Sequence, residues 1–508
     1  MILVFLLAFP AGVSSQTIRF CPGTPAPTAF NSATGAYEEG SSFDPFICAE
    51  QPCGELLHNI FEGLVSVSDR QAIQPELATG WQRLGEVRFR FTLRRGVAFH
   101  NGEPFDAEAV RFSLLRAAQA YGATGWFPEI AQVDVPAPYT VDVVLRVPDS
   151  LFLYRRGHIG LILSPRYFRQ VGQTAFGESP VGTGPFRFVR WDRTGREVAL
   201  EANDRYWRPG YPKVKRLIYR YMDSERALDL LTRGQLEVIR RLNPRKTTQF
   251  METGTGKVVK AWLPQLVLGP FNVLKPGTPL RDLRVRKAIN LAINREDLIR
   301  YGAIGNARLL AGYTVPGDPN HGDLRPYPFD AAQARELLRD AGYARGFTLS
   351  MLVSNEVPPQ LENIIAVSLR QIGITVTFKT ASEAEFLKEL YLPKFTASPA
   401  PPSFDVLLLS MPAGTIFHSG NVPMTLLYSR KPNESAVRDP VLDDLYEQAL
   451  RTYDPRKAGE LWKKLETYVH DEHLLLIGYQ EKAVFGATKR LRFTPRTLMT
   501  FWDAAYDG

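Results

Sequence analysis

The alternation of apolar strands with capped helices after about residue 270 is the feature that most constrains this fold. Apolar residues there switch between short continuous runs, typical of buried strands, and the three- and four-residue spacing of amphipathic helices. Asp282 and Asp330 stand where side chains cap helix starts, and Gly342 follows the second helix at a position that tolerates a left-handed backbone. Predicted strands lie at 347–353, 374–379, 404–410 and 474–480, and later helices start at Ser382 or span 440–452 and 455–471. This order predicts an α/β lobe on a parallel or mixed sheet.

The first half of the chain has a different rhythm, with short strands and many turns. Phe89, Phe91 and Leu93 alternate with polar residues, as in a half-buried strand, and Asp106 is placed to cap the next helix. The chain has 508 residues, whereas single cores stop growing at about 250–300 residues. The strand-rich half and the α/β half therefore predict two lobes that differ in kind.

Several residues resemble parts of active sites, but each fits a structural role better. His100 precedes a turn and a helix start, and we expect it to be hydrogen-bonded within its own loop. The Gly182–Gly184 turn leads into a strand rather than a helix, so we expect it to pack two strands instead of holding phosphate. His470 and His473 are expected at a solvated helix C-terminus. With no catalytic or metal-binding motif in the sequence, we expect no enzyme activity, no metal and no cofactor.

The N-terminus predicts export. Residues 1–15 contain an apolar run, a proline and small residues before a cleavage point, as in a signal peptide, although the basic start of such a leader is missing. No later run is long enough to span a membrane. Cys21 follows Thr-Ile-Arg-Phe rather than the apolar and small residues of a lipid-attachment motif. We therefore expect a periplasmic protein without a lipid anchor.

Cysteine usage and charge argue against a zinc-binding protein and against a nucleic-acid-binding protein. Three cysteines occur, Cys21, Cys48 and Cys53; we expect one disulfide among them, and all three pairings stay open. No histidine pair accompanies them at zinc spacing. The net charge of +8 is dispersed among acidic residues in almost every segment, which is typical of a solvated surface and argues against a nucleic-acid partner.

Several segments in order resemble the extracytoplasmic solute-binding proteins of ABC transporters, family 5, the peptide and nickel class that includes dipeptide- and oligopeptide-binding proteins. The most characteristic stretch is FRFTLRRGVAFHNGEPFDAEAVRFSLLR at 89–116. It is accompanied by FDPFICAEQPCGELLHNIFEGLV, QPELATGWQ, SPVGTGPFRFVRW, ANDRYW, LRDLRVRKAINLAINREDL, YPFDAAQARELLRDAGY and IGITVTF. The resemblance covers most of residues 40–480.

The resemblance implies an α/β fold, the two-lobed periplasmic-binding-protein clamshell of the class II or cluster C type, with an extra subdomain in the larger lobe. The larger lobe would comprise 16–265 and 480–508, with the inserted subdomain at about 56–165. The second lobe would comprise 273–474. The hinge would lie in two crossings, near 266–272 and 475–479.

The resemblance also implies a site between the lobes. Candidate ligand contacts are Phe43, Asp44, Phe271, Asn272, Ser410, Met411, Phe417, His418 and Tyr479. Phe271 and Tyr479 could equally be packed hinge aromatics. His418 could contact an anionic or hydroxyl-bearing ligand or a metal chelate, or it could be an ordinary exposed loop histidine. Residues 411–423 contain no carboxylate, whereas peptide binders of the family carry an aspartate there for the ligand's ammonium group. Whether the ligand is a peptide therefore stays open.

The function implied is capture of a short peptide or another small polar solute and its delivery to ABC permease subunits in the inner membrane. We expect a monomer. The segment at 21–42 is longer than in the family and is expected near the mouth of the cleft. Two alternatives use the same scaffold: an exported hydrolase-like enzyme, which would need an activated nucleophile, and a sensor or chaperone module that passes its ligand to another partner.

Overall fold

A computed structural model describes residues 16–22, 28–31, 36–39, 42–47, 51–68, 72–121, 129–154, 160–381, 403–412, 420–430 and 436–507. The predicted leader at 1–15, the helix expected from Ser382, and Cys48, Phe417 and His418 lie outside the described residues. Within the described residues, no helix combines the length and the apolar character needed to cross a membrane.

One large sheet runs through both lobes. Its strands follow the order β10-β11-β12-β1-β13-β19-β14-β18-β16-β17, and β15 pairs with β19 beside this path. The strands are β1 (Thr17–Cys21), β10 (Phe186–Asp192), β11 (Glu197–Ala202), β12 (Arg216–Arg220), β13 (Val238–Ile239), β14 (Gly256–Pro270), β15 (Ala307–Leu309), β16 (Phe347–Ser354), β17 (Ile374–Ala381), β18 (Val406–Pro412) and β19 (Leu475–Thr488).

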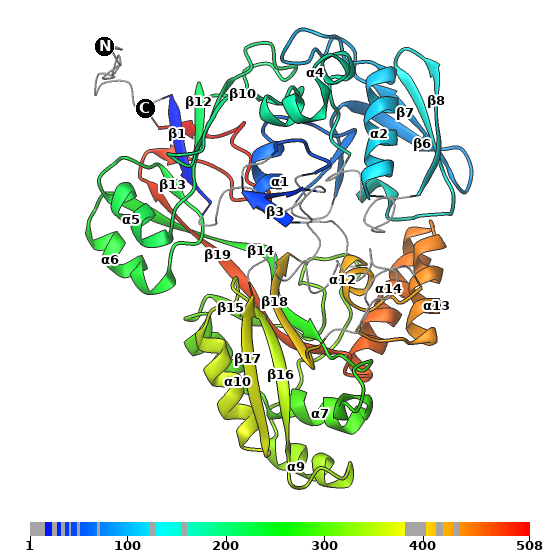
Figure 1. The fold of residues 1–508 in the computed structure, drawn as a ribbon, viewed down its shortest axis with the longest axis vertical. Helices are drawn as coiled ribbons and strands as arrows, with labels where there is room; N and C mark the ends of the chain where they lie inside the picture. Colours follow the sequence, from blue (N-terminus) through cyan, green and yellow to red (C-terminus); the bar gives the residue numbers. More distant parts are fainter. Residues whose placement is uncertain are drawn as a thin grey trace.

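The connection between the lobes is made by β14 and β19, which pair antiparallel along their lengths. At one end β19 pairs with β13 of the larger lobe, where Val238 lies opposite Ala487. At the other end β14 pairs with β18 of the second lobe, where Leu268 lies opposite Leu409. Figure 1 shows the two long strands side by side as they pass between the lobes.

The larger lobe carries a four-stranded antiparallel sheet with the order β6-β7-β9-β8. In β7 the predicted alternation is confirmed, because Phe89, Phe91 and Leu93 are buried. Asp106 accepts a hydrogen bond from the Ala109 N–H at 3.0 Å, as a helix cap does. These elements are β6 (Ala78–Arg83), β7 (Arg88–Leu93), β8 (Ile130–Ala137), β9 (Thr140–Leu145) and α2 (Ala107–Tyr121).

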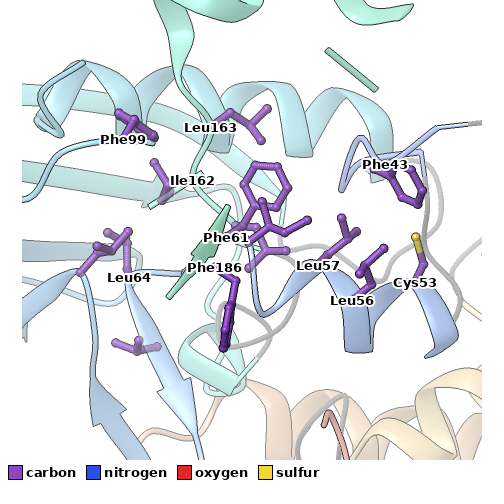
Figure 2. Packing of buried hydrophobic residues seen from close by; sticks show 14 of the residues in the cluster. Phe43, Cys53, Leu56, Leu57, Phe61, Leu64, Phe99, Ile162, Leu163 and Phe186 are labelled. Atoms are coloured by element: carbon purple, nitrogen blue, oxygen red, sulfur yellow. The ribbon is translucent and has the colours of Figure 1, made fainter. Parts of the chain in front are cut away.

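A short helix stands at the centre of the larger lobe. Figure 2 shows Leu56 and Leu57 of α1 (Gln51–Leu57) beside Phe61 in the buried cluster, with Ile162 and Leu163 close by. The remaining elements of this lobe are β2 (Thr28–Asn31), β3 (Ala36–Glu39), β4 (Val65–Val67), β5 (Ile73–Pro75), α4 (Pro165–Glu178), α5 (Ser224–Thr232), α6 (Thr247–Glu252), β20 (Leu491–Arg492) and β21 (Ala505–Tyr506). The cluster joins this helix to the antiparallel sheet.

The second lobe has the predicted α/β character. Its strands β17, β16 and β18 run parallel. The predicted caps are confirmed: Asp282 accepts from the Arg284 N–H at 2.8 Å and Asp330 from the Gln333 N–H at 2.8 Å. Its helices are α7 (Leu283–Ala292), α8 (Arg295–Asp297), α9 (Ala331–Asp340), α10 (Gln360–Arg370), α12 (Asn421–Leu426), α13 (Pro440–Arg451) and α14 (Pro455–Asp471).

Both faces of the second lobe's sheet are buried. Leu408 belongs to a core shared with α7, α9 and α10, whereas its neighbours Leu407 and Leu409 belong to a core shared with α12, α13 and α14. Successive strand residues point to opposite faces, so a strand covered on both sides is apolar throughout. This explains the continuous apolar run predicted at 404–410.

The lobes also touch far from the hinge strands, at a contact that we call the clasp: residues 149–151 of the larger lobe against Ala449–Tyr453 of the second. The Ser150 N–H donates to the Leu450 carbonyl at 2.7 Å, and the Ser150 hydroxyl donates to the Ala449 carbonyl at 3.2 Å. Leu151 is buried in a second-lobe core. The clasp thus joins the lobes at a second place besides β14 and β19.

Two predictions about histidines are wrong. His100 is bonded to the distant Gly182–Gly184 turn and not within its own loop: its Nδ1 accepts from the Gly182 N–H at 3.3 Å, and its Nε2 donates to the Gly184 carbonyl at 3.0 Å. Burial lowers the pKa of His100 to about 4. His470 lies in the last turn of α14, as predicted, but the expected solvation is wrong for His473, which is buried; both rings stack on Tyr327, at centroid distances of 4.4 and 4.5 Å.

Candidate functional site

A cavity of about 180 Å³ lies beside β14 and β19, where they pass from one lobe to the other. Its walls come from both lobes: Arg241 follows β13 in the larger lobe, whereas Glu356 follows β16 and Ser410 lies on β18 in the second. The other lining residues are Arg240, Leu242, Pro244, Leu263, Gln265, Glu481, Lys482, Ala483 and Val484. A solute in this cavity would contact both lobes at once.

An ion pair between Arg241 and Glu356 crosses the cavity from one lobe to the other. Arg241 has a φ of 60°, in the left-handed region that non-glycine residues rarely occupy. Such a conformation is kept only where the surroundings fix it, and it occurs often at ligand sites. The Glu356 N–H donates to the Ser354 hydroxyl at 3.3 Å, which helps to fix the loop after β16.

Glu481 is the second carboxylate in the cavity wall. It lies opposite Gln265 in the β14–β19 pairing, so the two side chains share a face of the sheet. Burial raises the pKa of Glu481 to about 7; the Arg241 guanidinium lowers this pKa and the Glu356 carboxylate raises it. Among the described residues, no cation lies within ion-pair distance of Glu481.

Two polar side chains complete this wall. The Gln265 amide Nε2 donates to the Ser410 hydroxyl at 2.9 Å. This bond uses a donor of the amide and leaves its carbonyl oxygen as an acceptor, and the serine hydroxyl keeps its own proton to donate. The wall therefore offers oxygen atoms of three chemical kinds: carboxylate, amide and hydroxyl.

The other arginine of the cavity has a structural role. Arg240 is buried, and it pairs with Glu55 and donates to the Thr497 carbonyl at 3.0 Å. Burial lowers its pKa to about 9. Its charge is balanced by Glu55, so Arg240 adds no uncompensated cation to the cavity.

On the opposite face of β14 and β19, two cations flank an exposed tryptophan. Arg308 lies 4.4 Å and the Lys482 ammonium 4.6 Å from the ring centroid of Trp262, which is 40% exposed. Arg308 also donates to the Gln480 amide oxygen at 2.7 Å. Because successive strand residues alternate, Lys482 points away from the face that carries Glu481.

The hinge residues predicted from the resemblance lie close together but are packed in the protein. Phe271 and Tyr479 are buried in one core of the second lobe. The Asn272 amide donates to the Phe404 carbonyl at 2.9 Å, and its N–H donates to the Asp405 carbonyl at 2.8 Å. None of the three lines the described cavity, so their role as ligand contacts stays a prediction.

The other predicted contacts divide between the lobes. Phe43 is buried against Phe188 and Trp191, and Asp44 is buried in an ion pair with Arg116. These two side chains do not line the described cavity either. In the second lobe Ser410 lines the cavity, whereas Met411 packs against the opposite core.

Sequence reasoning missed the three charged residues of the cavity, Arg241, Glu356 and Glu481. A signal was present for Glu481, since it stands two residues beyond the predicted contact Tyr479 in the same strand and therefore on the same face. No comparable signal existed for Arg241 and Glu356, because their pairing depends on how the two lobes meet.

The two described cysteines differ in oxidation state. Cys53 is disulfide-bonded, whereas Cys21 keeps its thiol, which donates to the Met222 carbonyl at 3.6 Å. The pairings that involve Cys21 are therefore wrong. The described residues contain no group of three histidine, cysteine, aspartate or glutamate side chains that could hold a metal ion.

Comparisons with known proteins agree on the fold. Glutathione-binding protein GsiB of Salmonella paratyphi A is 26% identical over 520 residues, which cover 97% of each chain. The structure of DppA from Helicobacter pylori in complex with the peptide STSA has a TM-score of 0.82 at 22% identity and covers 97% of this chain and 99% of that chain. The dipeptide-binding protein from Pseudoalteromonas sp. SM9913 in complex with Met-Leu has a TM-score of 0.80 at 19% identity and covers 97% of this chain and all of that chain.

The family assignment rests on the sequence itself. Residues 72–415 match the family described as Bacterial extracellular solute-binding proteins, family 5 Middle. This match spans more than half of the 508 residues and includes most of the subdomain, most of the second lobe and the cavity residues from Arg240 to Ser410. With its two-lobed fold, the chain therefore belongs to the bacterial extracellular solute-binding proteins of family 5, a family of solute-binding transport proteins.

Proposed function

We propose that this protein captures a short peptide or a peptide-like solute in the cavity between its lobes and delivers it to an ABC permease in the inner membrane. One observation carries the proposal: both lobes contribute charged and hydrogen-bonding side chains to one cavity. A ligand that contacts both lobes stabilises the closed arrangement by its greater affinity for that arrangement. The similarity to glutathione-binding protein GsiB over nearly the whole chain supports a peptide-like cargo.

The moving bodies are the lobes predicted from the sequence, 16–265 with 480–508 and 273–474. The buried cores support this division, since two of them lie in the first body and two lie in the second, with Leu151 of the clasp as an exception. The hinge comprises 266–272 and 475–479, where β14 and β19 carry the sheet across. We propose that the protein acts in the periplasm after removal of residues 1–15.

Binding is best tested by isothermal titration calorimetry of the purified full chain with glutathione, Met-Leu and Ser-Thr-Ser-Ala. We expect saturable binding of at least one of these peptides, with a stoichiometry of one. Native mass spectrometry of protein purified without refolding provides a second test, because a co-purified cargo should appear as a defined mass increase. Exclusive binding of solutes that are not peptides would contradict the proposed cargo.

The same experiment separates transport from catalysis. We propose that the protein carries out no reaction on its cargo. The solute recovered after saturation should be chemically unchanged, as judged by mass spectrometry over several hours. Turnover of the bound solute would favour the alternative of an exported enzyme.

A further inference from the structure

We propose that Glu481 is the residue that recognises a primary ammonium group of the solute, with the Arg241–Glu356 ion pair beside it. The inference rests on the proposed function, because it names the chemical group of the cargo that the cavity selects. In this proposal the negative charge that pairs with the solute ammonium comes from Glu481 on β19, and a second carboxylate, Glu356, lies in the loop after β16. Residues 411–423, where a carboxylate was sought, contain none.

The charges of the cavity leave one carboxylate uncompensated. Arg240 is paired with Glu55 and Arg241 with Glu356. The Lys482 ammonium lies over the Trp262 ring on the other face of the strand. Glu481 therefore has no cation at ion-pair distance among the described residues. A partly buried carboxylate without a counter-charge is unfavourable, and an incoming ammonium group would remove this penalty.

The oxygens around Glu481 suit an ammonium group rather than a carboxylate. A primary ammonium donates three hydrogen bonds and accepts none. Gln265, which faces the same side as Glu481, keeps its amide oxygen as an acceptor because its Nε2 is used on Ser410. Glu356 supplies a further carboxylate at the same cavity. A solute carboxylate would be repelled by both glutamates.

The ion pair makes recognition depend on closure. Arg241 and Glu356 come from different lobes, so they reach each other only when the lobes approach. In the closed arrangement the Arg241 guanidinium lowers the pKa of Glu481 and so offsets part of the rise that burial causes. An ammonium group held by Glu481 in this arrangement is enclosed by residues of both lobes. This couples amine recognition to the closed form.

The test compares free and N-acetylated peptides on wild type and on Glu481→Gln. N-acetylation removes the ammonium charge and keeps most of the solute, and glutamine keeps the size of glutamate. Loss of a charge-assisted contact should weaken binding of the free peptides by about ten- to a hundredfold. The N-acetylated forms of glutathione, Met-Leu and Ser-Thr-Ser-Ala should bind wild type and variant with equal affinity. This equality identifies Glu481 as the partner of the amine.

Matched variants keep the result specific. Glu336→Gln removes an exposed carboxylate on α9 and should leave every affinity unchanged. Glu481→Asp keeps the charge and should keep the preference for free over acetylated peptide, which provides a test should the glutamine variant fail to fold by circular dichroism. If wild type binds the peptides but N-acetylation or Glu481→Gln has no effect, the amine site is overturned and the proposed function stands. If wild type binds none of the peptides, the peptide-like cargo and the amine site are both overturned.

Discussion

The Asp149 N–H donates a hydrogen bond of 2.9 Å to the Tyr453 hydroxyl, and this bond joins the two lobes at a place remote from the hinge strands. The Tyr453 ring packs against the larger lobe, 6.0 Å from Phe89 between centroids and beneath the Arg83 guanidinium at 4.2 Å. Conversely, Leu151 of the larger lobe is buried in a core of the second lobe. Each lobe thus places one side chain in the other, which gives the clasp a specific geometry.

Removing the Tyr453 hydroxyl should destabilise the closed arrangement without touching the cavity. Tyr453→Phe removes the hydroxyl that accepts the hydrogen bond from the Asp149 N–H, and losing this bond costs about 1 kcal/mol. If the clasp opens during release, the dissociation rate of the solute should rise about fivefold. Stopped-flow tryptophan fluorescence measures this rate. Tyr301→Phe, which changes a tyrosine that is 55% exposed, is the control and should leave the rate unchanged. An unchanged rate in Tyr453→Phe would mean that the clasp persists through opening.

Binding of an amine should strengthen as the pH rises from 5 toward 7. The pKa of Glu481 is raised to about 7 by burial, so the free protein holds this carboxyl largely protonated at pH 5. Its ionised fraction then grows about tenfold between pH 5 and 6, while a peptide ammonium with a pKa near 8 stays charged. Arg241, Glu356 and Arg240 are the other charged side chains of the cavity; Lys482 also belongs to the wall, but its ammonium group lies over the Trp262 ring on the other face of the strand.

Calorimetry at several pH values checks this dependence. The dissociation constant of a free peptide should fall by up to about tenfold per pH unit below pH 6. Glu481→Gln should show a much flatter profile, because the titrating group is gone. An equal pH dependence in wild type and Glu481→Gln would assign the effect to another group.

Local features of this fold could be predicted from the sequence because their signals are local. The Asp282 and Asp330 caps and the alternating strand at 89–93 involve residues a few positions apart, and the structure confirms them. His100 was placed wrongly for the opposite reason. Its partners Gly182 and Gly184 are distant in the sequence, and nothing near His100 indicates them.

The candidate site was harder to predict because it is formed by the meeting of two lobes. The family resemblance indicates β18 and β19, and Ser410 lines the described cavity, whereas its contact with a ligand stays a prediction. It does not indicate which carboxylates face inward, since Glu356 and Glu481 look like ordinary surface residues in the sequence. The predicted aromatic contacts Phe43, Phe271 and Tyr479 are buried among apolar neighbours. The sequence did not show which aromatic side chains these neighbours would enclose.

A pair of interacting carboxyls in the larger lobe should make stability fall as the pH rises from about 4.5 to about 8. Burial raises the pKa of Glu62 to about 7 and that of Glu76 to about 8, and the charge of Glu62 adds to the shift of Glu76. Both values lie above 4.5, the ordinary value, so the folded state holds more protons than the unfolded state between about pH 4.5 and 8. The free energy of unfolding should therefore decrease as the pH rises through this window. Urea denaturation at pH 6 and 8 measures the decrease.

The hydrogen bonds indicate which carboxyl of the pair keeps the proton. Glu62 accepts from Thr183 at 2.9 Å, Tyr206 at 2.7 Å and Trp207 at 2.9 Å. Within the part of the chain that the structure describes, Glu76 accepts one bond, from the Gly63 N–H at 2.9 Å. A carboxylate that receives several donors is favoured in its ionised form, so the proton belongs on Glu76.

Two glutamine variants test this assignment against each other. Glu76→Gln mimics the protonated state and should flatten the loss of stability between pH 6 and 8. Glu62→Gln directs an amide N–H toward donors and should lower the free energy of unfolding by about 2–3 kcal/mol. The reverse order of effects would place the proton on Glu62.

Replacing Gly182 by alanine should destabilise the larger lobe severely. A Cβ atom at this position would lie 2.1 Å from the Ile60 carbonyl oxygen and 2.7 Å from the Phe61 ring. The turn cannot retreat easily, because the Gly182 N–H donates to His100 on its other side. Overpacking against backbone should lower the free energy of unfolding by about 2–4 kcal/mol in urea denaturation. Gly80→Ala, whose Cβ meets nothing within 4 Å, is the matched control and should change stability by less than about 1 kcal/mol. Equal stability of the two variants would show that the turn is looser than its packing against Ile60 implies.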